Sequence, residues 1–137
     1  MTPKQVAEYM LGQDHFSQWM DIRLIEIREN YCLIEMPVKK EMINGLKTVH
    51  GGVTFAFADS ALAFSSNNSG DAAVALNCVI NFTKAGKEGD VFKAESILAN
   101  ETRKTAVYDI KISNQNEELI AKFVGTVYKI GKKITEL

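Results

Sequence analysis

Cysteine, proline and histidine are scarce in this chain of 137 residues, which contains two of each. Two cysteines, Cys32 and Cys78, cannot build a disulfide framework, and their scarcity predicts a reducing location, the cytoplasm. Two histidines, His15 and His50, argue against a metal site built on several imidazoles. We therefore expect neither a metal nor an organic cofactor.

Long apolar runs and an excess of basic charge are also missing. No apolar stretch approaches the ~20 residues that a membrane-spanning helix needs, and residues 1–5 do not resemble the start of a secretory signal. The formal net charge is -1, which argues against nucleic acid as a partner because nucleic-acid-binding domains carry a basic excess. The length suits one domain over residues 1–137.

The spacing of the apolar residues predicts an α+β fold. Helical spacing predicts a helix at 3–12, inside a helical lead-in at 1–15, and a second helix at 52–66. Period-two alternation predicts a hairpin at 20–38 and four later strands at 73–82, 90–99, 105–113 and 118–130. Short turns join these strands, so we expect an antiparallel sheet of about six strands.

The predicted helix at 52–66 is apolar on nearly every side, which is typical of a helix buried all round. It is also the apolar helix available to cover one face of the sheet. We therefore expect a curved sheet to wrap it, a second subunit to complete the cover, or both. In either case an oligomer is expected.

Candidate chemistry is concentrated around the start of this helix. Gly51 and Gly52 leave backbone N–H groups unpaired at the positive end of the helix dipole, where they can polarise a carbonyl. Alternatively, the glycines only allow close packing of helix against sheet. His50 could donate a hydrogen bond to a substrate, hold Asn44 or cap the helix.

Asp59 is the one ionisable residue inside the predicted helix. An ionised carboxylate in apolar surroundings costs free energy unless it is paired or used. Burial would raise its pKa and make it a better base near neutral pH. Alternatively, it accepts hydrogen bonds from a neighbouring strand or subunit. Asp59 lies ~12 Å from Gly51 along the helix axis, which is too far for both residues of one chain to act on the same bound group. A site that uses both would therefore be shared by two chains.

The motif in this region resembles the hotdog-fold acyl-CoA thioesterases, and within them the PaaI-like branch of the phenylacetate pathway. It reads Asn44-Gly-x4-His50-Gly51-Gly52-x2-Phe55-x3-Asp59, followed later by Phe82-x3-Gly86-x2-Gly89-Asp90. The resemblance covers roughly residues 16–130. It implies a curved antiparallel sheet around one long helix, dimers that join two sheets edge to edge, and tetramers of two such dimers.

The resemblance also implies roles for single residues. The amide of Gly51 would polarise the thioester carbonyl, and Asp59 would attack it or activate water. Asn44 and His50 would orient the substrate and the attacking group. The chain departs from many relatives where Lys84 and Ala85 replace an Arg-Pro pair. A Ser or Thr that holds the water in some relatives has no clear counterpart among residues 75–77.

Five residues are candidates for contacts with the substrate: Gly52, Phe55, Asn77, Arg103 and Lys104. Gly52 and Phe55 belong to the motif itself. Asn77 either lines the edge of a site or lies at a subunit interface. Arg103 and Lys104 form a basic pair that is either a solvated turn or a contact for phosphate groups.

We expect hydrolysis of an acyl-CoA thioester. Phe55, Phe57, Phe64 and Met42 suit either an aryl-acyl group, such as phenylacetyl, or a medium-chain aliphatic acyl group. Two alternatives remain: a hydratase or dehydratase on the same fold, and a non-catalytic module that binds acyl-CoA. A histidine directly before the glycine pair and the presence of Asp59 favour hydrolysis over both.

Overall fold

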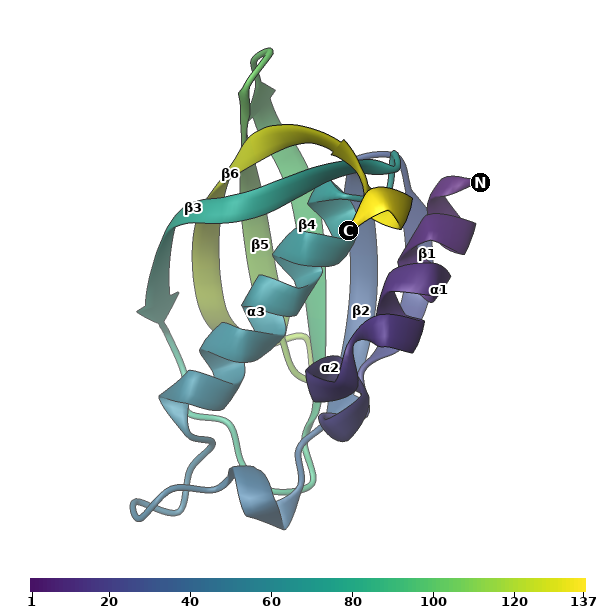
Figure 1. The fold of residues 1–137 in the computed structure, drawn as a ribbon. Helices are drawn as coiled ribbons and strands as arrows, with labels where there is room; N and C mark the ends of the chain where they lie inside the picture. The colour runs from purple at the N-terminus through teal and green to yellow at the C-terminus, as the bar shows by residue number, and fades with distance from the viewer.

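The computed structural model describes all 137 residues and contains one six-stranded sheet curved around a central helix (Figure 1). The central helix is α3 (Gly51–Ser66), and two shorter helices, α1 (Pro3–Gln13) and α2 (His15–Trp19), precede the first strand. The strands are β1 (Arg23–Arg28), β2 (Tyr31–Pro37), β3 (Asp71–Phe82), β4 (Val91–Glu101), β5 (Thr105–Ser113) and β6 (Leu119–Lys133). Single 3-10 turns lie at Lys40–Met42 and Ile134–Glu136. No helix has the length and apolar character needed to cross a membrane.

The sheet has the strand order β1-β2-β4-β5-β6-β3, and every neighbouring pair is antiparallel. The predicted fold class, the order of the strands and the long helix along the chain, and the antiparallel pairing are therefore confirmed. The strand order places β3 at one edge of the sheet and β1 at the other. The side of each edge strand that faces away from the sheet has no hydrogen-bonded neighbour in the chain.

Helix α2 is an element that the apolar spacing did not predict. Its N-cap is Asp14, whose side chain accepts a hydrogen bond from the Ser17 N–H at 2.9 Å. A helix of five residues completes little more than one turn, so it shows no apolar periodicity. The capping side chain is its main sequence signal.

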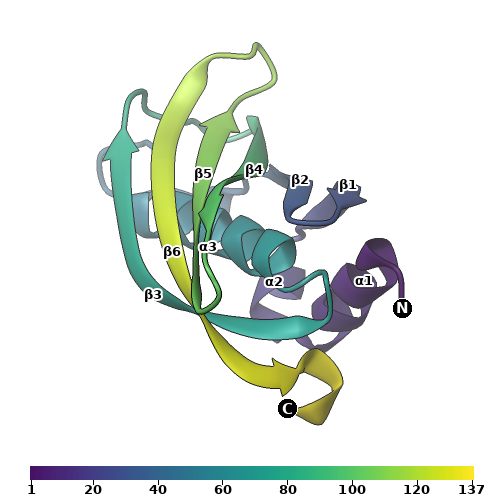
Figure 2. The same cartoon turned by 90° about the horizontal axis from the view of Figure 1, so that it is seen from above.

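The core lies between α3 and the concave face of the sheet. Large side chains from the helix and the strands are fully buried there, among them Phe57, Phe64, Ile34, Phe92 and Phe123. Figure 2 shows α3 inside the curve of the sheet, with α1 and α2 on its other side. Because the sheet is curved, the five strands β2 to β6 all contact α3. These contacts bury most of the apolar surface of the helix.

The single chain leaves one side of α3 partly open. Gly52 and Asp59 are exposed, and Phe55, Ala56 and Ala63 are only half-buried. These residues recur at helical spacing along α3, and α1 and α2 lie across the helix from the sheet (Figure 2). The curved sheet therefore supplies part of the cover expected for α3, and cover by a second subunit stays a prediction.

Gly86, in the loop between β3 and β4, holds the segment before α3 against the core. Its carbonyl accepts a hydrogen bond from the Val49 N–H at 2.9 Å. A Cβ at this position would lie 2.3 Å from Cζ of Phe92 and 2.9 Å from Cγ2 of Val49. Both side chains are buried, so neither can move away freely.

We predict that Gly86→Ala lowers the free energy of unfolding by about 1–3 kcal/mol, the usual cost of overpacking a core. Urea denaturation followed by circular dichroism measures the change. Gly12→Ala in α1 is the matched control, because a Cβ there meets nothing within 4 Å and alanine favours a helix. A Gly86→Ala protein as stable as the wild type would contradict the prediction.

Candidate active site

The first turn of α3 presents one backbone donor that the chain itself does not use. The Gly52 N–H donates to Nδ1 of His50 at 2.9 Å, and the amides of Val53 and Thr54 donate to the His50 carbonyl. The Gly51 N–H has no acceptor within the chain. It therefore remains available at the positive end of the helix dipole, where a developing oxyanion is stabilised.

His50 is the N-cap of α3, which is one of the three roles considered for it. Its Nδ1 accepts from an amide and so carries no proton, which places the ring proton on Nε2. No hydrogen bond joins the side chains of His50 and Asn44. The Nε2–H group makes no hydrogen bond within the chain and can donate to a bound substrate.

Asn44 closes the tight turn that leads into this segment. Its Oδ1 accepts from the backbone amides of Leu46 at 2.9 Å and Thr48 at 3.2 Å. Its own backbone N–H donates to the Thr48 carbonyl at 2.8 Å. The side-chain NH₂ makes no hydrogen bond within the chain, so it offers two further donors near the start of α3.

A groove of about 340 Å³ lies beside Gly51. The ring of Phe82, at the end of β3, approaches so closely that a Cβ on Gly51 would lie 3.2 Å from its Cζ. Glycine at 51 therefore serves close packing as well as an accessible amide. The groove is lined by Thr48, Val49, Gly51, Thr54, Phe82, Thr83, Lys84, Ala85, Gly86 and Ile120. The motif contains Phe82, but the sequence did not predict that its ring lies against Gly51, because β3 and α3 meet only in the folded chain.

Asp59 lies eight residues after Gly51 on the open side of α3 and forms no hydrogen bond or ion pair. Partial burial raises the pKa of its carboxyl, and the negative charge of Asp14 raises it further. The predicted direction of the pKa shift is therefore found, although the side chain is exposed in the single chain rather than enclosed by it. A carboxylate with a raised pKa and no cationic partner is a good candidate for a base or nucleophile.

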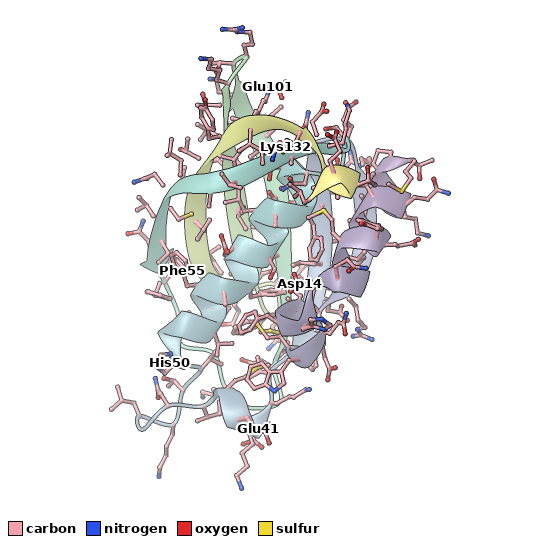
Figure 3. The ribbon with its side chains drawn as sticks, in the orientation of Figure 1. Asp14, Glu41, His50, Phe55, Glu101 and Lys132 are labelled. Carbon is pink, nitrogen blue, oxygen red and sulfur yellow. The ribbon has the colours of Figure 1, made fainter.

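Gly52, Phe55 and Asp59 share one face of α3, because residues three, four and seven positions apart lie on the same side of a helix. The ring of Phe55 packs edge-on against Phe123, with ring centroids 5.2 Å apart. Phe55 is half-buried, so part of its ring remains accessible beside the helix (Figure 3). This face therefore combines an aromatic surface with the carboxylate.

The other candidate contacts lie away from the start of α3 in the same chain. Asn77 is exposed on β3 and alternates with Cys78, which packs against the core, so it faces the outer side of the sheet. Arg103 and Lys104 are exposed in the turn between β4 and β5. Figure 3 shows Glu101, at the end of β4, and His50 at opposite ends of the molecule. Arg103 and Lys104 closely follow Glu101, so they lie far from the start of α3 in the same chain.

Comparison with known proteins identifies the family. The family model described as Thioesterase superfamily matches residues 46–121, so the chain belongs to that superfamily. The acyl-coenzyme A thioesterase PaaI of Escherichia coli K12 is 37% identical over 96% of this chain and 94% of its own length. The structure of E. coli PaaI, a protein of the phenylacetic acid degradation operon, superposes with a TM-score of 0.94, at 35% identity, over 96% of this chain and 95% of that one.

Two streptococcal structures have the same fold and were solved with coenzyme A compounds. One is a Streptococcus mutans protein bound to acetyl-CoA, with a TM-score of 0.79 and 27% identity over 82% of this chain and 90% of that one. The other is a hypothetical thioesterase of Streptococcus pneumoniae with coenzyme A. Its TM-score is 0.79, at 26% identity over 82% of this chain and 88% of that one. The hotdog fold and the resemblance to the PaaI-like branch are confirmed.

We predict that Asp59→Asn raises the melting temperature at neutral pH and leaves it unchanged in strong acid. A folded-state pKa above the ordinary value means that ionisation of the carboxyl disfavours the folded state. This cost is absent below the unfolded pKa of about 3.9 and complete above the raised folded pKa. Stability should therefore fall as pH rises between the two values in the wild type and not in the variant.

Thermal unfolding over a pH series measures this difference between the two proteins. Asp109→Asn, at an exposed position without hydrogen bonds on the outer face of β5, is the control and should leave the melting temperature unchanged. An Asp59→Asn protein less stable than the wild type at neutral pH would show that the carboxylate contributes to folded-state stability.

Proposed function

We propose that this chain is a single-domain acyl-CoA thioesterase that hydrolyses an aryl-acyl or medium-chain acyl-CoA to the free acid and CoA. The observation that carries the proposal is the free Gly51 N–H at the start of α3, beside a groove and on the same helix as Asp59. The similarity to E. coli PaaI supports acyl-CoA as the substrate class. The free thiols of Cys32 and Cys78 support a cytoplasmic location.

In this proposal the Gly51 N–H donates to the thioester oxygen as negative charge develops on it. Asp59 either attacks the carbonyl carbon or removes a proton from a water that attacks it. If Asp59 attacks, a C–O bond to its carboxylate forms, the C–S bond breaks, CoA leaves as the thiolate, and water then hydrolyses the mixed anhydride to the free acid. If Asp59 acts as a base, the water oxygen bonds to the carbon, the water proton passes to Asp59, the C–S bond breaks, and the proton is then available to the CoA thiolate. The Nε2–H of His50 and the NH₂ of Asn44 orient the substrate, since both donors are free.

The two catalytic groups of one helix are too far apart to act on one carbonyl. Eight residues separate them by ~12 Å along the axis, whereas an attacking group must lie ~3 Å from the reacting carbon. We therefore propose that each site combines Gly51 of one chain with Asp59 of a second. In such an assembly Asn77 could line the site from the outer face of β3, and Arg103 and Lys104 could contact the CoA phosphates.

The free edge of the sheet supports the dimer. Strand β3 has no partner on its outer side, and it carries exposed apolar side chains: Val74 (50%), Leu76 (65%), Val79 (54%) and Phe82 (56%). A long apolar edge strand is prone to pair with another chain unless it is covered. Pairing of two β3 strands would join the sheets edge to edge. The open face of α3 supports assembly of two such dimers into a tetramer.

The test of the activity is a panel of phenylacetyl-, octanoyl-, acetyl- and crotonyl-CoA with free thiol release as the readout. We expect hydrolysis of the aryl or medium-chain thioester, and the same rate after EDTA treatment. Asp59→Asn should reduce kcat by at least about 100-fold, while Asp109→Asn should not. Hydration of crotonyl-CoA without thiol release would identify a hydratase instead, and binding without turnover would identify a binding module.

A shared site predicts that two inactive variants rescue each other. Asp59→Asn and Asn44→Ala proteins, each inactive alone, are unfolded, mixed in equal amounts and refolded together. In a mixed dimer one site collects both defects and the other is native. Random pairing should therefore restore roughly a quarter of the wild-type activity. No recovery, with mixed dimers verified by native mass spectrometry, would show that the sites are not shared.

A further inference from the structure

A chain of three hydrogen-bonded side chains connects the start of α2 to the catalytic helix. The Asp14 carboxylate accepts from the Ser17 N–H at 2.9 Å and from the Ser17 hydroxyl at 2.6 Å. Oγ of Ser17 lies 2.9 Å from Oγ of Ser60, and the two serines are 0% and 8% exposed. Ser60 directly follows Asp59 on α3, and Figure 3 shows Asp14 beside this helix.

The direction of these hydrogen bonds follows from the groups involved. An ionised carboxylate can only accept, so Ser17 gives its single hydroxyl proton to Asp14. Oγ of Ser17 must then accept the proton of Ser60. Both hydroxyl dipoles then point toward Asp14. The arrangement therefore holds a negative charge against the turn of α3 that carries Asp59.

Two titratable side chains from other elements interact electrostatically with Asp59. Asp14, between α1 and α2, raises the pKa of Asp59, although partial burial is the larger cause. Cys78 on β3 has its own pKa raised by burial and by Asp59, so its thiol stays neutral and adds no charge. No basic side chain forms an ion pair with Asp59. Asp14 is therefore the neighbouring charge that acts on it.

Building on the proposed role of Asp59 in hydrolysis, we propose that Asp14 is a positioning residue for the reaction. Through Ser17 and Ser60 it fixes α2 against the third turn of α3 and keeps a second negative charge near the turn that carries Asp59. Such a charge disfavours ionised Asp59 and makes it more reactive toward a proton or an acyl carbon once it is ionised. Nothing in this role requires Asp14 to touch the substrate.

The test replaces Asp14 without removing the helix cap. Asn and Ser both serve well as N-caps, so Asp14→Asn and Asp14→Ser remove the charge and keep α2. We expect the acid limb of kcat/KM against pH to move to lower pH in both variants. The titration of the Asp59 carboxyl carbon, followed by NMR, should move in the same direction. Asp21→Asn is the control, since Asp21 is exposed, pairs with Lys39 and has a φ of 55°, which Asn tolerates.

The possible outcomes separate this inference from the proposed function. If the wild type hydrolyses no thioester, the proposed function fails, but the NMR titration still decides whether Asp14 acts on Asp59. An unchanged Asp59 titration in the folded variants overturns the inference. A lower kcat with an unmoved acid limb also overturns it, since that result indicates a purely structural role.

If neither Asp14 variant folds, Ser60→Ala takes their place, because it leaves Ser17 paired with Asp14 and removes only the link to α3. Loss of this link should free the Asp14 carboxylate to move away from α3. The acid limb and the Asp59 titration should then move to lower pH, and unchanged values would overturn the inference.

Discussion

The packing of one apolar helix against the concave face of a curved sheet is the constraint on which the rest of this structure depends. Burial of α3 brings β3, the loop with Gly86 and the segment before the helix together at one end of the molecule. The hydrogen bond between Val49 and Gly86 then fixes the chain just before His50. Because the core holds this end in place, the first turn of α3 has a defined position relative to the groove beside Phe82.

Local hydrogen bonds decide which backbone donor remains free at that end. His50 folds back to accept from Gly52, and the turn closed by Asn44 uses the carbonyl oxygen of that side chain. The Gly51 amide, the Nε2–H of His50 and the NH₂ of Asn44 are left over. Of these donors the Gly51 amide lies in the lining of the groove, and an uncharged amide there is the kind of group that stabilises a developing oxyanion.

The side of α3 that the chain leaves open carries the Asp59 carboxylate. In the single chain Asp59 is exposed yet carries a raised pKa, so its surroundings already favour the neutral acid. A second chain over this face would exclude more water and strengthen that effect. The proposed shared site and the Asp14–Ser17–Ser60 hydrogen bonds therefore act on the same group. A group kept reactive in this way is expected to reduce stability, as active-site residues commonly do.

Much of this architecture could be read from the order of residues along the chain. The apolar segment at 52–66 became α3, the period-two segments became strands, and the motif around Asn44, His50, Gly51 and Asp59 led to the family. These features are local: a helix or strand pattern repeats over neighbouring residues, and the glycine pair and its flanking residues lie within sixteen positions of each other.

The tertiary structure decided which surfaces and side chains meet. It left one side of α3 uncovered, separated Arg103 and Lys104 from the start of α3, and placed Phe82 over Gly51. It also joined Ser17 to Ser60 across 43 positions in sequence. Contacts of this kind depend on how far the sheet curves and which elements close over the helix. That outcome is set by the packing of the whole core, and no local pattern of residues contains it.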